Sequence, residues 1–220
     1  MLQIIKLDWF TIKYCQKRIF IILPCVFLAG YISSIYVVPT SAILFFLFSL
    51  KLYAVEEKGD LNRLFLTLPV TRNTIVTGRY CLSLFMVFGG IAAGIILMPI
   101  TNLVSFSKWY PDLKWMITIV AFSLFVCALF YFFMYPILFK LGYQKGKFWG
   151  FYLPAVLLGS IYIAFLEYAS LPGKETLITG LLIYASEHLI LICGGILFLT
   201  FALLVASYLL SLYFYIRREF

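Results

Sequence analysis

The sequence is poor in charged residues, above all in acidic residues and histidine. Of its 220 residues, 12% are charged, nine are Asp or Glu, and one, His188, is histidine. Hydrophobic residues make up 64% of the chain, which leaves too few polar side chains to cover a water-soluble core. A single histidine excludes a metal site built from several histidines and the His-Glu-x-x-His pattern of metalloproteases. The composition therefore predicts a membrane protein without a metal site.

Two further absences concern nucleotide binding and disulfides. Gly146-Lys147 and Gly173-Lys174 lack the glycine five positions upstream that a P-loop requires, so the sequence has no signature for binding ATP. We expect the chain to bind no cofactor, to have no catalytic residue and not to be an enzyme. The five cysteines fall in apolar stretches or at their edges, which favours a packing role over a disulfide framework.

Long apolar stretches dominate the remaining sequence. A helix rises about 1.5 Å per residue, so roughly 20 apolar residues cross the ~30 Å hydrocarbon layer of a membrane. Six stretches reach or approach that length, and they are 19–38, 40–55, 80–100, 115–139, 149–168 and 188–216. They group into pairs over 19–55, 80–139 and 149–216, joined by polar segments 56–79 and 140–148. We predict an all-α polytopic membrane protein in which residues 1–220 form one transmembrane domain with six transmembrane helices.

The distribution of lysine and arginine predicts the orientation. Of the 17 Lys and Arg residues, 14 lie on the side of the two termini, and three (Lys108, Lys114 and Lys174) lie on the other side. Cytoplasmic loops carry the excess of basic residues, so both termini are predicted to be cytoplasmic. The net charge of +8 then indicates this topology and an attraction to anionic membrane lipid. No soluble basic face points to nucleic acid.

Residues 1–18 have the pattern of a helix that lies in the membrane interface. Leu2, Ile5, Trp9 and Ile12 recur at helical spacing, while basic residues such as Lys13 occupy another face. The alternative is that these residues extend the first span. That alternative would bury several basic side chains at high cost, so we favour the interfacial helix.

The connections between spans carry weaker signals. Tyr36–Ser41 contains a proline and is predicted to be an external turn, whereas Lys140–Lys147 is predicted to be a compact basic turn in the cytoplasm. The external segment near 169–187 includes an apolar run too short to span, which favours a re-entrant or interfacial helix. Within the third span, Gly90 and Gly94 form a small-xxx-small pair that would let two helices approach closely.

Residues 56–79 are the longest polar interruption of the apolar sequence. Asp60 can cap a short helix, because its side chain can accept a hydrogen bond from a backbone N–H of the first turn. Pro69 ends that helix, since its ring disfavours helical geometry in the preceding residue. Thr71 can cap a second helix that continues into the third span. The short helix presents an apolar stripe made of Leu61, Leu64, Phe65 and Leu68, which suits docking into a groove on a partner protein.

Three features of this segment carry a family resemblance. They are Glu56-Glu57-Lys58-Gly59, the core Leu66-Thr67-Leu68-Pro69-Val70-Thr71-Arg72, and Ile75-Val76 followed by Gly78-Arg79-Tyr80. At these residues the chain resembles the permease subunits of type-2 ABC transporters, particularly the small bacterial group with six spans. Thr67 stands where that family usually has a serine. The motif covers about a tenth of the chain, and the span number, the orientation and the interfacial N-terminal helix also agree.

The resemblance implies a role for each region. Segment 56–79 would contain the coupling helix that sits in a cleft of a separate ATPase subunit, and residues 1–18 would form the elbow helix. The residues implied in coupling are Glu56, Glu57, Asp60, Leu61, Leu64, Phe65, Leu68, Pro69 and Arg72. Two copies of the ATPase, carrying ATP and Mg²⁺, and a second permease subunit, identical or paralogous, would complete the assembly in the bacterial cytoplasmic membrane.

The predicted function is that of an exporter permease. ATP hydrolysis by the partner would drive outward transport of an amphipathic or hydrophobic cargo, and some members of the resembled group export cytolytic or antimicrobial peptides while others handle lipids or drugs. The alternative is a membrane-embedded immunity protein that binds a toxic peptide without moving it. A neighbouring ATPase gene would distinguish the two. A secondary carrier would need paired charges at the membrane midplane, which the spans lack.

Three ionisable residues lie at the outer ends of the fifth and sixth spans, namely Glu167, Glu187 and His188. Ionisable groups at membrane depth suggest a functional site. At span ends water can reach them, so an ordinary solvated helix end is the alternative. The functional interpretation is a polar patch on an external gate.

Overall fold

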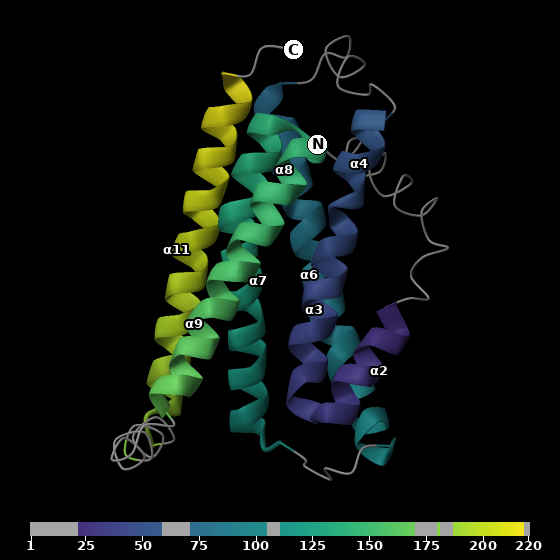
Figure 1. The fold of residues 1–220 in the computed structure, drawn as a ribbon, viewed down its shortest axis with the longest axis vertical. Helices are drawn as coiled ribbons and strands as arrows, with labels where there is room; N and C mark the ends of the chain where they lie inside the picture. The colour runs from purple at the N-terminus through teal and green to yellow at the C-terminus, as the bar shows by residue number, and fades with distance from the viewer. Residues whose placement is uncertain (1–21, 59–70, 105–110, 170–179, 181–186, 218–220) are drawn as a thin grey trace.

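The described part of the protein is built from helices and turns. A computed structural model describes residues 22–58, 71–104, 111–169, 180 and 187–217, and these ranges contain no strand (Figure 1). The predicted all-α membrane fold is thereby confirmed. The predicted elbow helix at 1–18 lies outside the described residues. So do six predicted coupling residues, namely Asp60, Leu61, Leu64, Phe65, Leu68 and Pro69.

Ten helical elements follow one another in the described ranges. They are α2 (Ile22–Ile32), η2 (Ser34–Tyr36), α3 (Val37–Ser49), α4 (Lys51–Lys58), α6 (Arg72–Val104), α7 (Leu113–Leu141), α8 (Tyr143–Lys147), η3 (Phe148–Tyr152), α9 (Leu153–Ala169) and α11 (Leu189–Ile216).

Four of the six predicted spans correspond to helices long and apolar enough to cross a membrane. These helices are Ser34–Val55, Arg72–Leu103, Leu113–Leu141 and Leu189–Ile216. At the other two predicted spans, α2 has 11 described residues and α9 has 17. The six-span arrangement therefore stays a prediction.

The turn predicted at Tyr36–Ser41 is wrong. The chain leaves α2 at Ser33, whose backbone is extended (φ −162°, ψ 139°), and η2 then leads directly into α3. Pro39 lies in the first turn of α3. A proline is tolerated there because the first N–H groups of a helix have no partner within the helix. This proline therefore belongs to the start of a span and does not interrupt the chain.

The turn predicted over Lys140–Lys147 is confined to Gly142. That residue has φ 81°, a conformation that favours glycine, and its N–H donates to the carbonyl of Leu138 at the end of α7 (2.9 Å). Gly146 lies within α8 instead, and a Cβ added there would lie 3.0 Å from Leu138 Cδ2. The connection between α7 and α8 is therefore tight.

Helices α3 and α6 approach closely at the Gly90 and Gly94 pair. A Cβ added at Gly90 would lie 2.9 Å from the Ser41 carbonyl oxygen, and one at Gly94 would lie 2.9 Å from Val38 Cα. Ser41 Oγ donates a hydrogen bond to the carbonyl oxygen of Gly90 (2.8 Å). The close approach predicted from the small-xxx-small spacing is confirmed.

Substituting Gly94 is expected to destabilise this contact. Gly94→Leu would force α3 away from α6, and we expect the free energy of unfolding to fall by about 1–3 kcal/mol. Gly89→Leu is the matched control, because a Cβ at Gly89 meets no atom within 4 Å. Thermal unfolding of the purified full-length variants in one detergent measures the difference. Equal unfolding temperatures for the two variants would contradict the close packing.

An aromatic core lies where α3, α6 and α7 meet. Phe46 of α3 packs edge-on against Tyr131 of α7, with ring centroids 4.7 Å apart. Tyr80 of α6 lies 4.7 Å from Tyr135 of α7 by the same measure, and all four rings are buried. On its other side α7 packs along α11 (Figure 1). Helix α7 is therefore central, and its contacts position the polar groups of the candidate site.

Candidate functional site

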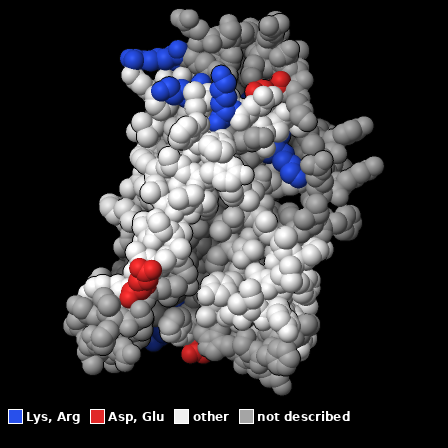
Figure 2. Space-filling view, viewed as in Figure 1, with Lys and Arg blue, Asp and Glu red and all other residues white. Residues whose placement is uncertain are grey.

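The residues that flank 59–70, within the polar segment 56–79, lie at the end of the bundle where most basic side chains gather, which we call the basic end. Residues 59–70 join Lys58, at the end of α4, to Thr71, just before α6. Figure 2 shows that most of the visible Lys and Arg side chains gather at this end, over α8 and the C-terminal end of α11. Among the predicted coupling residues, Glu57 and Arg72 are described here with their side chains, and Glu56 lies in α4.

Before residues 59–70, the end of α4 is bonded to α8 through Glu57. Its Oε2 atom accepts a hydrogen bond from the backbone N–H of Gln144 (2.8 Å), the second residue of α8. The first N–H groups of a helix lack partners within the helix, and a carboxylate satisfies them well because both its charge and its lone pairs suit the site. Glu57 therefore connects α4 to the N-terminal end of α8 through a backbone group of α8.

After residues 59–70, the start of α6 is bonded to α11 through Arg72. The Arg72 Nη1 atom donates to the carbonyl oxygen of Ile216 (2.6 Å) and, at 3.4 Å, to that of Tyr215. These are the last carbonyls of α11, which favour a cation at this position. Thr71 begins α6 as predicted, because its Oγ1 accepts a hydrogen bond from the Thr74 N–H (3.4 Å).

A line of side-chain hydrogen bonds continues from Arg72 along the contact between α6 and α11. Thr77 Oγ1 pairs with the Tyr208 hydroxyl (2.9 Å). The Tyr80 hydroxyl lies within hydrogen-bonding distance of Ser207 Oγ (2.7 Å) and Ser211 Oγ (2.8 Å). In a membrane such a bond contributes about 0.6 kcal/mol on average. We call this set the α6–α11 seam, and it comprises Arg72, Thr77 and Tyr80 with Ser207, Tyr208, Ser211, Tyr215 and Ile216.

The seam is also bonded to α7, which makes the three helices one unit at this end. Ser207 Oγ donates to the backbone carbonyl oxygen of Tyr131 (2.7 Å). The Tyr80 ring stacks on that of Tyr131 with centroids 5.9 Å apart. A displacement at the start of α6 would therefore be shared with α11 and α7.

Arg79 carries a buried positive charge beside the seam. Its side chain is 4% exposed, and the guanidinium carbon lies 4.7 Å from the ring centroid of Tyr53 in α4 and 5.7 Å from that of Phe139 in α7. The faces of aromatic rings attract a cation and partly offset the cost of removing it from water. The distribution of lysine and arginine predicts Arg79 to be on the cytoplasmic side, but nothing in the sequence predicts that its side chain is buried.

One comparison with known proteins decides the family. The model of a family described as ABC-2 family transporter protein matches residues 3–216. The chain belongs to the ABC-2 transporter family. No curated protein and no solved structure matches it. It is therefore an integral membrane permease of an ABC transporter, a subunit without catalytic activity that works with a separate ATPase subunit.

In this ABC-2 permease the predicted gate residues lie at the other end of the bundle. Glu167 is exposed near the end of α9, and Glu187 and His188 are exposed just before α11. The backbone carbonyl of His188 accepts the N–H of Ile192 (3.1 Å), so this residue begins the helix. Figure 1 places the end of α9 and the start of α11 at the same end of the molecule. Their role in a gate stays a prediction.

The sequence predicted Glu57 and Arg72 as coupling residues of this ABC-2 permease, but it did not predict their hydrogen-bond partners. Those partners are backbone groups at helix ends, which every helix possesses. Ser207 and Ser211 gave a readable signal, since they are polar residues four apart on an apolar span and therefore share a helix face. Within the part of the chain that the structure describes, no group of three His, Cys, Asp or Glu could hold a metal ion.

Proposed function

We propose that the chain is one of two permease subunits, identical or paralogous, that form the membrane core of an ATP-driven exporter. Segment 56–79 would dock into a cleft of the ATPase, which is present in two copies. The observation that supports this most is that the residues on either side of 59–70 are hydrogen-bonded to the bundle, through Glu57 to α8 and through Arg72 to α11. A segment bonded at both ends transmits a displacement, whereas a loosely attached loop would absorb it.

Helix α11 would carry that displacement across the membrane. Its 28 residues rise about 42 Å from end to end. One end is capped by Arg72, and the other begins next to His188. Closure of the ATPase dimer would tilt the start of α6, and the seam would tilt α11 with it. The paired subunits would thereby change between two arrangements, and Glu187 and His188 would move with the external gate.

The proposed cargo is an amphipathic or hydrophobic peptide of the cytolytic or antimicrobial kind. Helices α9 and α11 expose large apolar side chains, among them Ile161, Phe198 and Phe201. Two subunits facing each other would therefore enclose a path with apolar walls and few charges. Such walls accept the apolar face of a peptide by burial of apolar area.

Release of a labelled amphipathic peptide from cells tests the proposal. Cells carry the permease with either an active ATPase or a variant that binds ATP without hydrolysing it. We expect release only with the active ATPase, and equal release in both would overturn the ATP-driven mechanism. Resistance to a toxic peptide that persists with the inactive ATPase, without release, would favour the alternative of an immunity protein.

Substituting Arg72 is expected to separate ATP hydrolysis from transport. Arg72→Ala removes charge-assisted hydrogen bonds worth about 1.5–3 kcal/mol, so the transport rate per hydrolysed ATP should fall by roughly tenfold or more. Asn73→Ala is the matched control, because Asn73 is the neighbouring exposed residue. Parallel assays of ATP hydrolysis and peptide release measure the ratio. An unchanged ratio in Arg72→Ala would contradict transmission through α11.

A further inference from the structure

Helical turn η3 directs three aromatic side chains outward at the basic end of the bundle. Gly150 is buried, and a Cβ added there would lie 3.1 Å from a Cα atom of α7. Phe151 stacks on Phe130 of α7, with ring centroids 5.9 Å apart. These two contacts fix one side of η3 against the bundle. The other side carries Phe148, Trp149 and Tyr152, whose side chains are 58%, 56% and 56% exposed.

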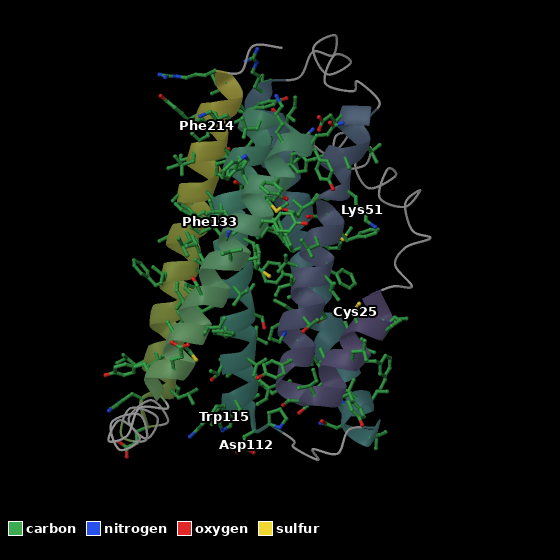
Figure 3. The ribbon with its side chains drawn as sticks, viewed as in Figure 1. Cys25, Lys51, Asp112, Trp115, Phe133 and Phe214 are labelled. Carbon is green, nitrogen blue, oxygen red and sulfur yellow. The ribbon has the colours of Figure 1, made fainter. Side chains whose placement is uncertain are left out.

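Three exposed basic residues lie at the same end of the bundle as these rings, and two of them are in contact with other aromatic rings. Lys140 is exposed near the end of α7, and its Nζ atom lies 5.1 Å from the ring centroid of Phe214 in α11. Phe214 is labelled near this end of the bundle in Figure 3. The Arg217 guanidinium carbon lies 4.2 Å from the ring centroid of Tyr213. Lys145 is exposed on α8. We call the set the basic–aromatic rim, which comprises Lys140, Lys145, Phe148, Trp149, Tyr152 and Arg217.

We propose that the basic–aromatic rim binds the headgroups of anionic phospholipids. Aromatic residues such as Trp and Tyr prefer the boundary between hydrocarbon and water, where one part of the ring system is apolar and another is hydrated. Lysine and arginine at that depth can donate hydrogen bonds to phosphate oxygens and attract a net negative headgroup. The rim combines both kinds of side chain at the basic end of the bundle (Figure 2).

The surface next to the rim favours lipid over a protein partner. On the side of α9 the exposed surface continues directly into Leu153, Val156 and Leu157, whose side chains are 39%, 67% and 45% exposed. A typical protein interface has an apolar centre surrounded by polar residues. Here the apolar surface extends away from the charges along a helix, which is the arrangement expected at the edge of a hydrocarbon layer.

The test compares lipid retention by the purified full-length chain in nanodiscs of phosphatidylcholine with and without phosphatidylglycerol. We expect the wild type to retain phosphatidylglycerol selectively in native mass spectrometry. The triple variant K140Q/K145Q/R217Q should lose this selectivity, because each basic residue near an anionic surface strengthens binding about fivefold. The variant K140R/K145R/R217K should keep it. Lys114→Gln is the control at the opposite end, where Figure 3 labels the neighbouring residues Asp112 and Trp115.

Equal retention of phosphatidylglycerol by the wild type and the glutamine triple variant would overturn the lipid site. If that variant in addition captured the purified ATPase more weakly than the wild type, the rim would be a protein interface. The lipid measurement contains neither ATPase nor cargo, so its failure is distinguishable from a failure of the exporter proposal.

Discussion

Leu64→Asp and Phe65→Asp are each expected to abolish the stimulation of the partner ATPase by the permease. Both residues belong to the apolar stripe predicted for the short helix between Asp60 and Pro69. Docking of that stripe into the ATPase would bury a large apolar side chain, which contributes about 1.5–3 kcal/mol, and a buried carboxylate adds a desolvation cost. Together these terms should weaken the complex by roughly a hundredfold or more.

Asn62→Asp provides the matched control for the charge introduced by these two substitutions. Asn62 lies within the same predicted helix but off the stripe. We expect Asn62→Asp to retain stimulated ATP hydrolysis, and all three variants to reach the membrane at the level of the wild type. The measurement is ATP hydrolysis by the purified ATPase with and without the reconstituted permease. Wild-type stimulation by Phe65→Asp, or its loss in Asn62→Asp, would contradict a docking role for the stripe.

Arg79→Ala is expected to produce the largest loss of stability among single substitutions at the basic end. The long Arg79 side chain fills the space between Tyr53 and Phe139, and its truncation would leave a cavity and remove the contacts between cation and rings. We expect the free energy of unfolding to fall by about 3 kcal/mol. Thermal unfolding of the full-length protein in detergent, followed by circular dichroism, measures the change.

Arg79→Met separates the volume of the side chain from its charge. Methionine fills a similar space, and replacing a buried charge by an apolar side chain of like volume is often neutral for stability. We therefore expect Arg79→Met to unfold close to the temperature of the wild type. An unfolding temperature for Arg79→Met as low as that of Arg79→Ala would show that the cation itself stabilises the bundle. Wild-type stability of Arg79→Ala would contradict a packing role altogether.

The long spans could be predicted from the sequence because hydropathy alone determines them. The predicted spans 115–139 and 188–216 differ from α7 and α11 by at most two residues at either end. The start of α3 could not be found in this way. Pro39 has the same sequence signature in a turn and in the first turn of a helix, and its position relative to the helix start depends on where α2 ends.

The candidate site could be predicted in part, for a related physical reason. Glu57 and Arg72 stand out as charges beside apolar helices, and the family motif contains both. Glu57 accepts from a backbone N–H and Arg72 donates to a backbone carbonyl, and no residue type marks such partners in a sequence. Only packing brings the ends of α8 and α11 next to α4 and α6. The burial of Arg79 likewise depends on rings supplied by two other helices.

The π-helical turn at η3 has a consequence for how insertions and deletions would act on this protein. A π-helical turn accommodates an extra residue relative to an α-helical one. Deleting one residue within Phe148–Tyr152 can therefore be absorbed by the return of this turn to ordinary α-helix, which leaves the outward side of α9 where it is. A deletion within α9 itself meets no extra residue and would rotate every later residue of that helix by about 100° around its axis. A homologue with a one-residue gap at η3 is therefore compatible with the same outward side of α9, whereas a homologue with a gap inside α9 is not.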